Sequence, residues 1–69
     1  MKLSARNVLK GKVLEVKKGT TTAHVRIGIA GGAVVTASIT NEAVEDLRLT
    51  SDDDVYAVIK ASDVIVARD

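Results

Sequence analysis

Aromatic side chains and cysteine are almost absent from this 69-residue chain. Tyr56 is the only aromatic residue, and there is no Phe, Trp or Cys. No disulfide can therefore staple the fold, and no cysteine–histidine set can hold a structural metal. A domain of this length buries only about 60% of the surface that its unfolded chain exposes. We therefore expect the chain to gain stability by assembling with further copies of itself.

Segments that would send the chain out of the cytoplasm are also missing. The first residues contain neither an apolar signal core nor a cleavage site, and the longest apolar runs are far too short to cross a bilayer. A secreted protein of this size is usually disulfide-bonded. These absences predict a cytoplasmic protein.

Several function classes are disfavoured by scarce residue types. Proteins that bind single-stranded nucleic acids stack bases on aromatic rings, and only Tyr56 is available. His24 is the only histidine and has no partner at a spacing typical of a catalytic triad. Asp52, Asp53 and Asp54 lack the alternating carboxylates of a calcium loop. The sequence therefore predicts no enzyme and no site for a metal cation.

Charge is balanced over the whole chain but not along it. The formal net charge is +1, yet residues 1–32 hold seven basic residues and one acid, giving +6. Residues 33–69 hold three basic residues and eight acids, giving −5. Complementary halves suit contacts within or between copies of the chain, whereas nucleic-acid binders more often have a basic excess.

β-branched residues are the most prominent feature of the composition, since Val, Ile and Thr make up 22 of the 69 residues. They suit strands and predict an all-β fold. We expect a first strand over about residues 5–16, with Gly11 at a bulge or bend. Residues 17–20 then form a hairpin loop in which Gly19 can adopt a positive φ.

Alternation of apolar and polar residues predicts the next two strands. Apolar residues occupy every second position over 23–29 and again over 35–39, and Ala30-Gly31-Gly32 forms the turn between them. One face of each strand therefore belongs to the core.

The apolar period changes after Thr40, which can cap a short helix running to about Leu47, with Val44 and Leu47 on the face that plugs the barrel. Residues 50–54 form a solvated turn, residues 55–59 a strand apolar on both faces, and residues 64–67 a last short strand.

Five strands with one helix between the third and fourth predict an OB-like barrel. A strand apolar on both faces needs an outer cover, so at least a dimer is expected.

Two short polar stretches interrupt the apolar runs near the chain ends: Ser4-Ala5-Arg6-Asn7 and Lys60-Ala61-Ser62. Each combines one cation with hydroxyl and backbone donors. Hydrogen bonds to charged groups contribute roughly 1.5–3 kcal/mol each, so the two cations together suit a tetrahedral dianion. The ordinary alternative is capping and surface charge at strand ends.

Five motifs give the chain a family resemblance: S-A-R-N at 4–7, L-x-G-x-V at 9–13, Gly-Gly at 31–32, I-T at 39–40 and I-K-A-S-x-V at 59–64. In this combination, nearly the whole chain resembles the Mop family of molybdate-binding proteins, the molbindins. The resemblance implies one domain over 1–69 that binds molybdate or tungstate at subunit interfaces of a homo-hexamer built from three dimers. With no Gly-x-x-x-x-Gly-Lys loop and no room for a helix-turn-helix, the chain resembles the stand-alone form, which implies intracellular storage and homeostasis of molybdenum.

The resemblance also implies which residues meet the oxyanion. In the first site these are Ser4, Ala5, Arg6, Thr40, Ala43, Lys60, Ala61 and Ser62, of which Ala5 and Ala61 supply backbone. Thr40 is implied to reach the anion from a neighbouring subunit, and Ala43 stands where relatives commonly have Ser. A second site lined largely by backbone is implied, with the loop Gly19-Thr20-Thr21-Thr22 as its candidate.

Two other functions stay open at this point. OB-folds often bind nucleic acids, and a chain of this kind could also be an assembly module whose pockets bind nothing.

Overall fold

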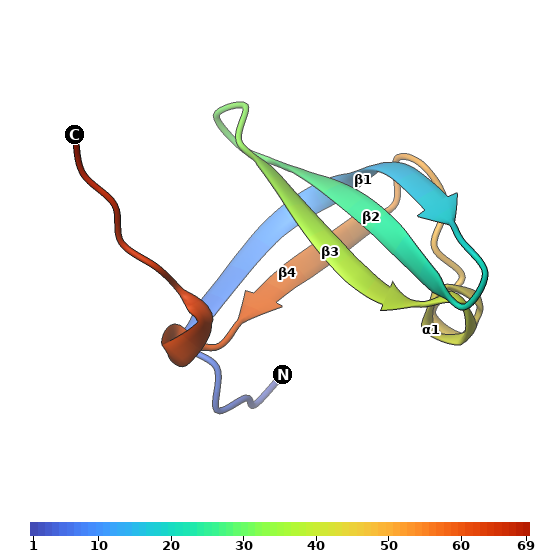
Figure 1. The fold of residues 1–69 in the computed structure, drawn as a ribbon, viewed down its shortest axis with the longest axis horizontal. Coiled ribbons are helices and arrows are strands. Elements are labelled where there is room, and N and C mark those ends of the chain that lie inside the picture. Colours follow the sequence, from blue (N-terminus) through green and yellow to red (C-terminus); the bar gives the residue numbers. More distant parts are fainter.

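The computed structural model describes residues 1–69 as four antiparallel strands curled into a half-barrel, with one short helix (Figure 1). The elements in chain order are β1 (Asn7–Lys18), β2 (Thr22–Ile29), β3 (Val34–Thr40), α1 (Asn41–Leu47), β4 (Asp54–Ile59) and a 3₁₀ turn η1 (Ala61–Asp63). The strand order β3-β2-β1-β4 leaves β3 and β4 as the two open edges of the sheet. The prediction of a mainly β fold with a helix between the third and fourth strands is confirmed.

The predicted fifth strand is not formed within the chain. Residues 64–67 are extended but pair with no other strand, and Figure 1 shows the tail running away from the sheet. The cause lies in η1, where the Asp63 N–H donates to the Lys60 carbonyl (2.9 Å) and the Val64 N–H to the Ala61 carbonyl (3.3 Å). This turn directs the chain away from β4.

β1 begins and ends two residues later than predicted, and Gly11 is not its bulge. Gly11 is paired with residues of both β2 and β4, and a Cβ there would lie 2.5 Å from the Gly28 carbonyl oxygen. Gly11 therefore permits a close approach of two backbones. The ladder register shifts instead between Val13 and Glu15, which leaves Leu14 without an opposite residue on β2. A bulge bends a strand, and this one curves β1.

Both predicted hairpins are formed, but only one of them uses glycine in the left-handed region. Gly31 and Gly32 turn the chain between β2 and β3 with φ of +94° and +96°. Gly19 is not among the residues with positive φ. The β1–β2 turn is closed by a hydrogen bond from the Gly19 N–H to the Thr22 carbonyl (2.7 Å), so the left-handed conformation is not needed there.

The core lies on the concave face of the sheet. Its six buried side chains are Val13, Ala23, Val25, Ile27, Val44 and Ala57. The predicted alternation of β2 and β3 is confirmed, since the residues assigned inward are buried or half-buried and the others exposed, apart from the half-buried Gly28. Val44 joins the core, but Leu47 is two-thirds exposed, so the prediction that it packs inside is wrong.

β4 is apolar on both faces, as predicted. Ala57 is buried on the inner face, while Tyr56 and Val58 on the outer face are 55% and 44% exposed. The chain alone leaves this outer apolar surface uncovered. Its one α-helix has seven residues, and no helix is long or apolar enough to span a membrane.

Candidate anion-binding site

The two polar stretches predicted from the sequence lie at the same end of the sheet. β1 pairs antiparallel with β4, and Asn7 is opposite Ile59 in the last pair of the ladder. The Asn7 side-chain amide also donates to the Ile59 carbonyl oxygen (3.1 Å), which ties the two ends together. Arg6 and Lys60 are the next residues outward from this pair. The structure therefore brings Ser4-Ala5-Arg6 beside Lys60-Ala61-Ser62.

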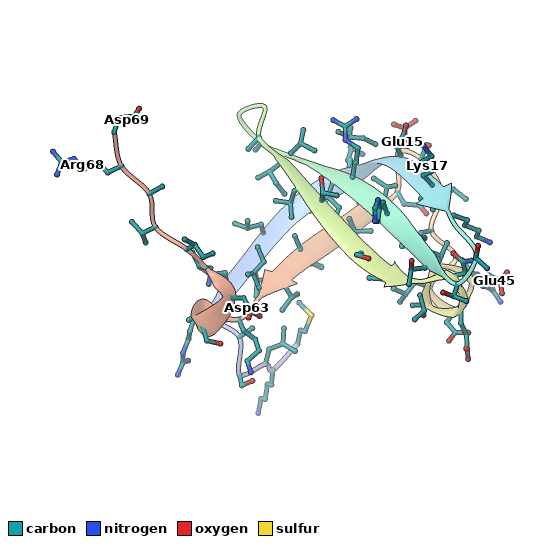
Figure 2. The ribbon with its side chains drawn as sticks, in the orientation of Figure 1. Glu15, Lys17, Glu45, Asp63, Arg68 and Asp69 are labelled. Atoms are coloured by element: carbon teal, nitrogen blue, oxygen red, sulfur yellow. The ribbon has the colours of Figure 1, made fainter.

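Neither cation at this end has a partner within the chain. Arg6 and Lys60 are exposed, and the two ion pairs of the chain are Lys12–Asp54 (3.1 Å) and Lys18–Glu45 (3.3 Å). The nearest acid in the sequence is Asp63, which Figure 2 shows on η1 at this end of the molecule. Its carboxylate makes no ion pair with either cation. All guanidinium and ammonium donors therefore remain available to an external anion.

Backbone donors add to the cations at η1. No backbone hydrogen bond of the turns, loops and caps uses the N–H groups of Ala61 and Ser62. The hydroxyls of Ser4 and Ser62 make no hydrogen bond in the chain either. No group of three or more His, Asp or Glu side chains is arranged to hold a metal ion. The site is thus a set of hydrogen-bond donors suited to an oxyanion.

Thr40 and Ala43 lie elsewhere in the chain. Thr40 is paired with Thr22 at the start of β2, beside the end of β1 that carries Lys18, whereas Arg6 precedes the other end of β1. One copy therefore does not bring Thr40 to Arg6. The Ala43 N–H donates to the Thr40 hydroxyl oxygen (3.0 Å) in the helix cap, so it is already engaged.

The loop Gly19–Thr22 of the predicted second site is held by a residue that the sequence reasoning missed. The Asn41 side-chain amide donates to the carbonyls of Gly19 (2.9 Å) and Thr20 (3.4 Å), and the Asn41 N–H donates to that of Thr21 (2.9 Å). The acceptors of this loop therefore turn toward α1. An Asn next to a helix cap was the available signal, but its partners are 20 to 22 residues away in the sequence.

Basic side chains near this loop were also missed. A depression of about 280 Å³ has no hydrophobic residue in its lining, which consists of Lys17, Lys18, Gly19, Thr22 and His24. Lys17 and His24 are directly opposite each other on β1 and β2. Only strand register brings them together, because seven positions separate them in the sequence.

A second concavity has the opposite chemistry. A cleft of about 490 Å³ lies over the inner face between β3 and β4, and twelve of its thirteen lining residues are hydrophobic. Such a surface offers no donors to an anion. It is the open side of the half-barrel.

Comparisons with known proteins agree with this fold. The sequence pattern of the TOBE domain matches residues 3–66. Molybdenum-pterin-binding protein 3 of Clostridium pasteurianum is 50% identical over 66 residues, which cover 96% of this chain and 97% of that protein.

Solved structures show the same similarity. A molybdate-binding protein from Sporomusa ovata superposes with a TM-score of 0.93 at 38% identity, covering 99% of this chain and all of that one. The cytoplasmic molybdate-binding protein ModG, crystallised with molybdate bound, superposes with a TM-score of 0.91 at 43% identity, covering 94% of this chain and 46% of that one. Since the pattern match and the relatives both span nearly the whole chain, it belongs to the TOBE domain family and, within it, to the small molybdenum-binding proteins of the Mop group that its motifs resemble.

Proposed function

We propose that this chain binds molybdate or tungstate at interfaces between its copies and serves storage and homeostasis of molybdenum in the cytoplasm. The observation that carries the proposal is that Arg6 and Lys60, two cations without an ion pair in the chain, directly flank the last residue pair of the β1–β4 ladder. In the proposal, residues 1–69 act as one domain. The oxyanion is a bound ligand and not a cofactor, and the protein, like its relatives, is not an enzyme.

The donor-only character of the site supports this choice of ion. Molybdate at neutral pH is a fully deprotonated dianion and only accepts hydrogen bonds. Hydrogen phosphate carries a proton that needs an acceptor, and an unsatisfied buried polar group costs about 1–3 kcal/mol. Sulfate is smaller and leaves some donors out of reach, whereas tungstate has nearly the same size and charge as molybdate. We expect the site to bind phosphate much more weakly than molybdate, and to bind molybdate and tungstate with similar affinity.

The position of Thr40 supports a site shared between copies. Because Thr40 and Ala43 are at the far end of β1 from Arg6, they can join Ser4, Arg6, Lys60 and Ser62 only from a neighbouring subunit. The exposed apolar residues Tyr56 and Val58 offer a surface for such a neighbour. We propose a homo-hexamer of three dimers.

The Gly19–Thr22 loop is proposed as part of a second oxyanion site. Asn41 occupies the carbonyl oxygens that would repel an anion, and Lys17, Lys18 and His24 line the adjoining depression. The hydroxyls of the three threonines remain available as donors. All four residues of the loop are exposed in a single copy, as are Ser4, Arg6, Lys60 and Ser62 of the first site.

Titration calorimetry and native mass spectrometry test the proposal together. Wild-type protein is titrated with molybdate, tungstate, sulfate and phosphate, and Arg6→Ala is compared with Arg26→Ala, which removes an exposed arginine from the middle of β2. We expect the wild type to bind molybdate and tungstate. Of the two variants, only Arg6→Ala should have a lower affinity for these ions. Native mass spectrometry should give a hexamer that gains mass with molybdate. A hexamer without bound ions would instead support a purely structural assembly module, and salt-sensitive binding of an oligonucleotide would support a nucleic-acid module.

A further inference from the structure

We propose that Asn7 is a positioning residue of the anion site. It holds the chain segments that carry Arg6 and Lys60 at a fixed spacing and thereby favours molybdate over the smaller sulfate. This inference rests on the proposed function and deepens it, because it names the group that sets the selectivity of the same site. Asn7 acts through the two cations and does not itself contact the ion.

Two chain segments leave the sheet at this end without further links between them. The ladder of β1 and β4 ends at the pair Asn7–Ile59. Residues 1–6 take part in no backbone hydrogen bond of the turns and loops, and residues 60–64 bond only within the turn η1. No side-chain hydrogen bond or ion pair joins the two segments beyond the last pair. The spacing of the two cations is therefore set where the ladder ends.

The Asn7 side chain supplies the outermost bond at this end of the ladder. Its Nδ2 donates to the Ile59 carbonyl oxygen (3.1 Å), and the bond is partly buried. β4 is an edge strand, so only β1 holds it to the sheet. The ends of strands fray at a small cost in free energy. A side-chain bond at the last pair opposes fraying, because opening it leaves a partly buried donor and acceptor without partners.

An amide is well suited to this position beside an anion. Asn7 and Asn41 carry the only side-chain amides of the chain, and both donate to backbone carbonyl oxygens far away in the sequence. An amide N–H donates without carrying a charge, whereas an ionised carboxylate offers acceptors alone. Asn7 can therefore fix the two segments without placing a negative charge next to the ion.

A fixed spacing of donors matters most for the choice between ions of equal charge. Molybdate and sulfate are both tetrahedral dianions at neutral pH, and sulfate is the smaller. Donors that are held apart leave sulfate partly unsatisfied, whereas donors on loose segments can close around either ion. Holding the segments in advance also reduces the cost of ordering them when the larger ion binds. Loss of the Asn7 bond should therefore weaken molybdate binding more than sulfate binding.

Titration calorimetry of Asn7→Leu tests this proposal, with sulfate measured by its competition with molybdate. Leucine is close to asparagine in shape but has no donor. We expect the molybdate affinity to fall by about fivefold to tenfold, the range for one lost hydrogen bond, and the sulfate affinity to change by less than about twofold. The control is Val8→Ala, which trims a partly exposed side chain in the next pair of the ladder and should keep the ratio of the two affinities. Equal losses for both ions, or an unchanged molybdate affinity, would overturn the proposal.

A double-mutant cycle separates positioning from a general loss of stability. If Asn7 acts through the cations, its replacement should matter less once Arg6→Ala has removed one of them. We expect the fold-loss of molybdate affinity in the double variant to be smaller than the product of the two single losses. Losses that multiply would show that Asn7 acts independently of Arg6, which contradicts the positioning role.

The same measurements distinguish this proposal from the proposed function. A wild type that binds no molybdate would refute both, whereas binding that is weakened by Arg6→Ala but not by Asn7→Leu would refute only the role of Asn7. If Asn7→Leu does not fold, NMR of the wild type decides. Only two side chains give amide signals, and that of Asn7 is identified by its contacts with Ile59. We expect it to exchange slowly with solvent before any ion is added, and rapid exchange would overturn the proposal.

Discussion

Arg6 and Lys60 are the residues on which the proposed function depends. They are far apart in the sequence but flank the same residue pair of the β1–β4 ladder, and neither is neutralised within the chain. Sequence reasoning could select them because each stands beside serine and alanine in a short polar break between apolar runs. It could not show that they lie at the same end of the sheet, because that depends on the register of β1 against β4.

Replacing either cation should weaken molybdate binding by far more than replacing a hydroxyl. We expect Arg6→Ala or Lys60→Ala to cost at least about 1.5–3 kcal/mol, the range for hydrogen bonds to charged groups, and more if the interface buries the ion. Ser62→Ala should cost about 1–2 kcal/mol. Titration calorimetry measures both. A cation variant that binds within twofold of wild type would contradict the role assigned to that residue.

Thr40 has a structural role in each copy that can be separated from any role toward the anion. Its hydroxyl oxygen caps α1 by accepting from the Ala43 N–H. We expect Thr40→Ala to lower the free energy of unfolding by about 1 kcal/mol, and Thr40→Ser to leave it nearly unchanged, because serine caps equally well. Urea denaturation measures this. Equal stability of Thr40→Ala and wild type would show that the cap contributes nothing.

At the scale of elements, alternation predicted β2 and β3 well because each has one face on the core and one in solvent. The bend in β1 could not be found in the same way. A glycine within a strand suits both a bulge and a close backbone approach, and only the ladder shows that Gly11 serves the second purpose. The bulge at Leu14 has no glycine to mark it.

Two glycine substitutions within the sheet should therefore differ in cost. A Cβ at position 11 meets the Gly28 backbone oxygen at 2.5 Å, whereas a Cβ at position 28 meets the end of the exposed Leu14 side chain at 3.1 Å. A side chain can move aside more easily than a paired backbone. We expect Gly11→Ala to destabilise by about 1–3 kcal/mol, the range for overpacking, and Gly28→Ala by clearly less. Chemical denaturation of both variants measures this, and the reverse order would contradict the observed packing.

At the scale of the whole molecule, one copy is poorly equipped to be stable alone. Only six side chains are buried, the barrel is open on one side, and the outer face of β4 is apolar and exposed. These features agree with the expectation, drawn from the scarcity of aromatic residues, that copies associate.

Stability should then depend on protein concentration. Association stabilises the folded chain by mass action, so the melting temperature should rise with concentration and rise further when molybdate is added. Scanning calorimetry over a hundredfold range of concentration measures this, with sulfate as the control ion. A melting temperature independent of concentration, together with monomers in native mass spectrometry, would contradict an assembled protein.

The sequence by itself determined the mainly β class, the faces of β2 and β3, the capped helix and the residue types of the proposed oxyanion site. These follow from local properties: side-chain branching, a period of two, capping chemistry and charge. Tertiary structure alone decided that Arg6 and Lys60 lie at the same end of the sheet, that Thr40 lies at the other end of β1, and that residues 64–67 leave the sheet unpaired. The first two depend on strand register, which is set by backbone hydrogen bonds between residues distant in the sequence. The third depends on the turn at η1, whose backbone hydrogen bonds set the direction of the tail.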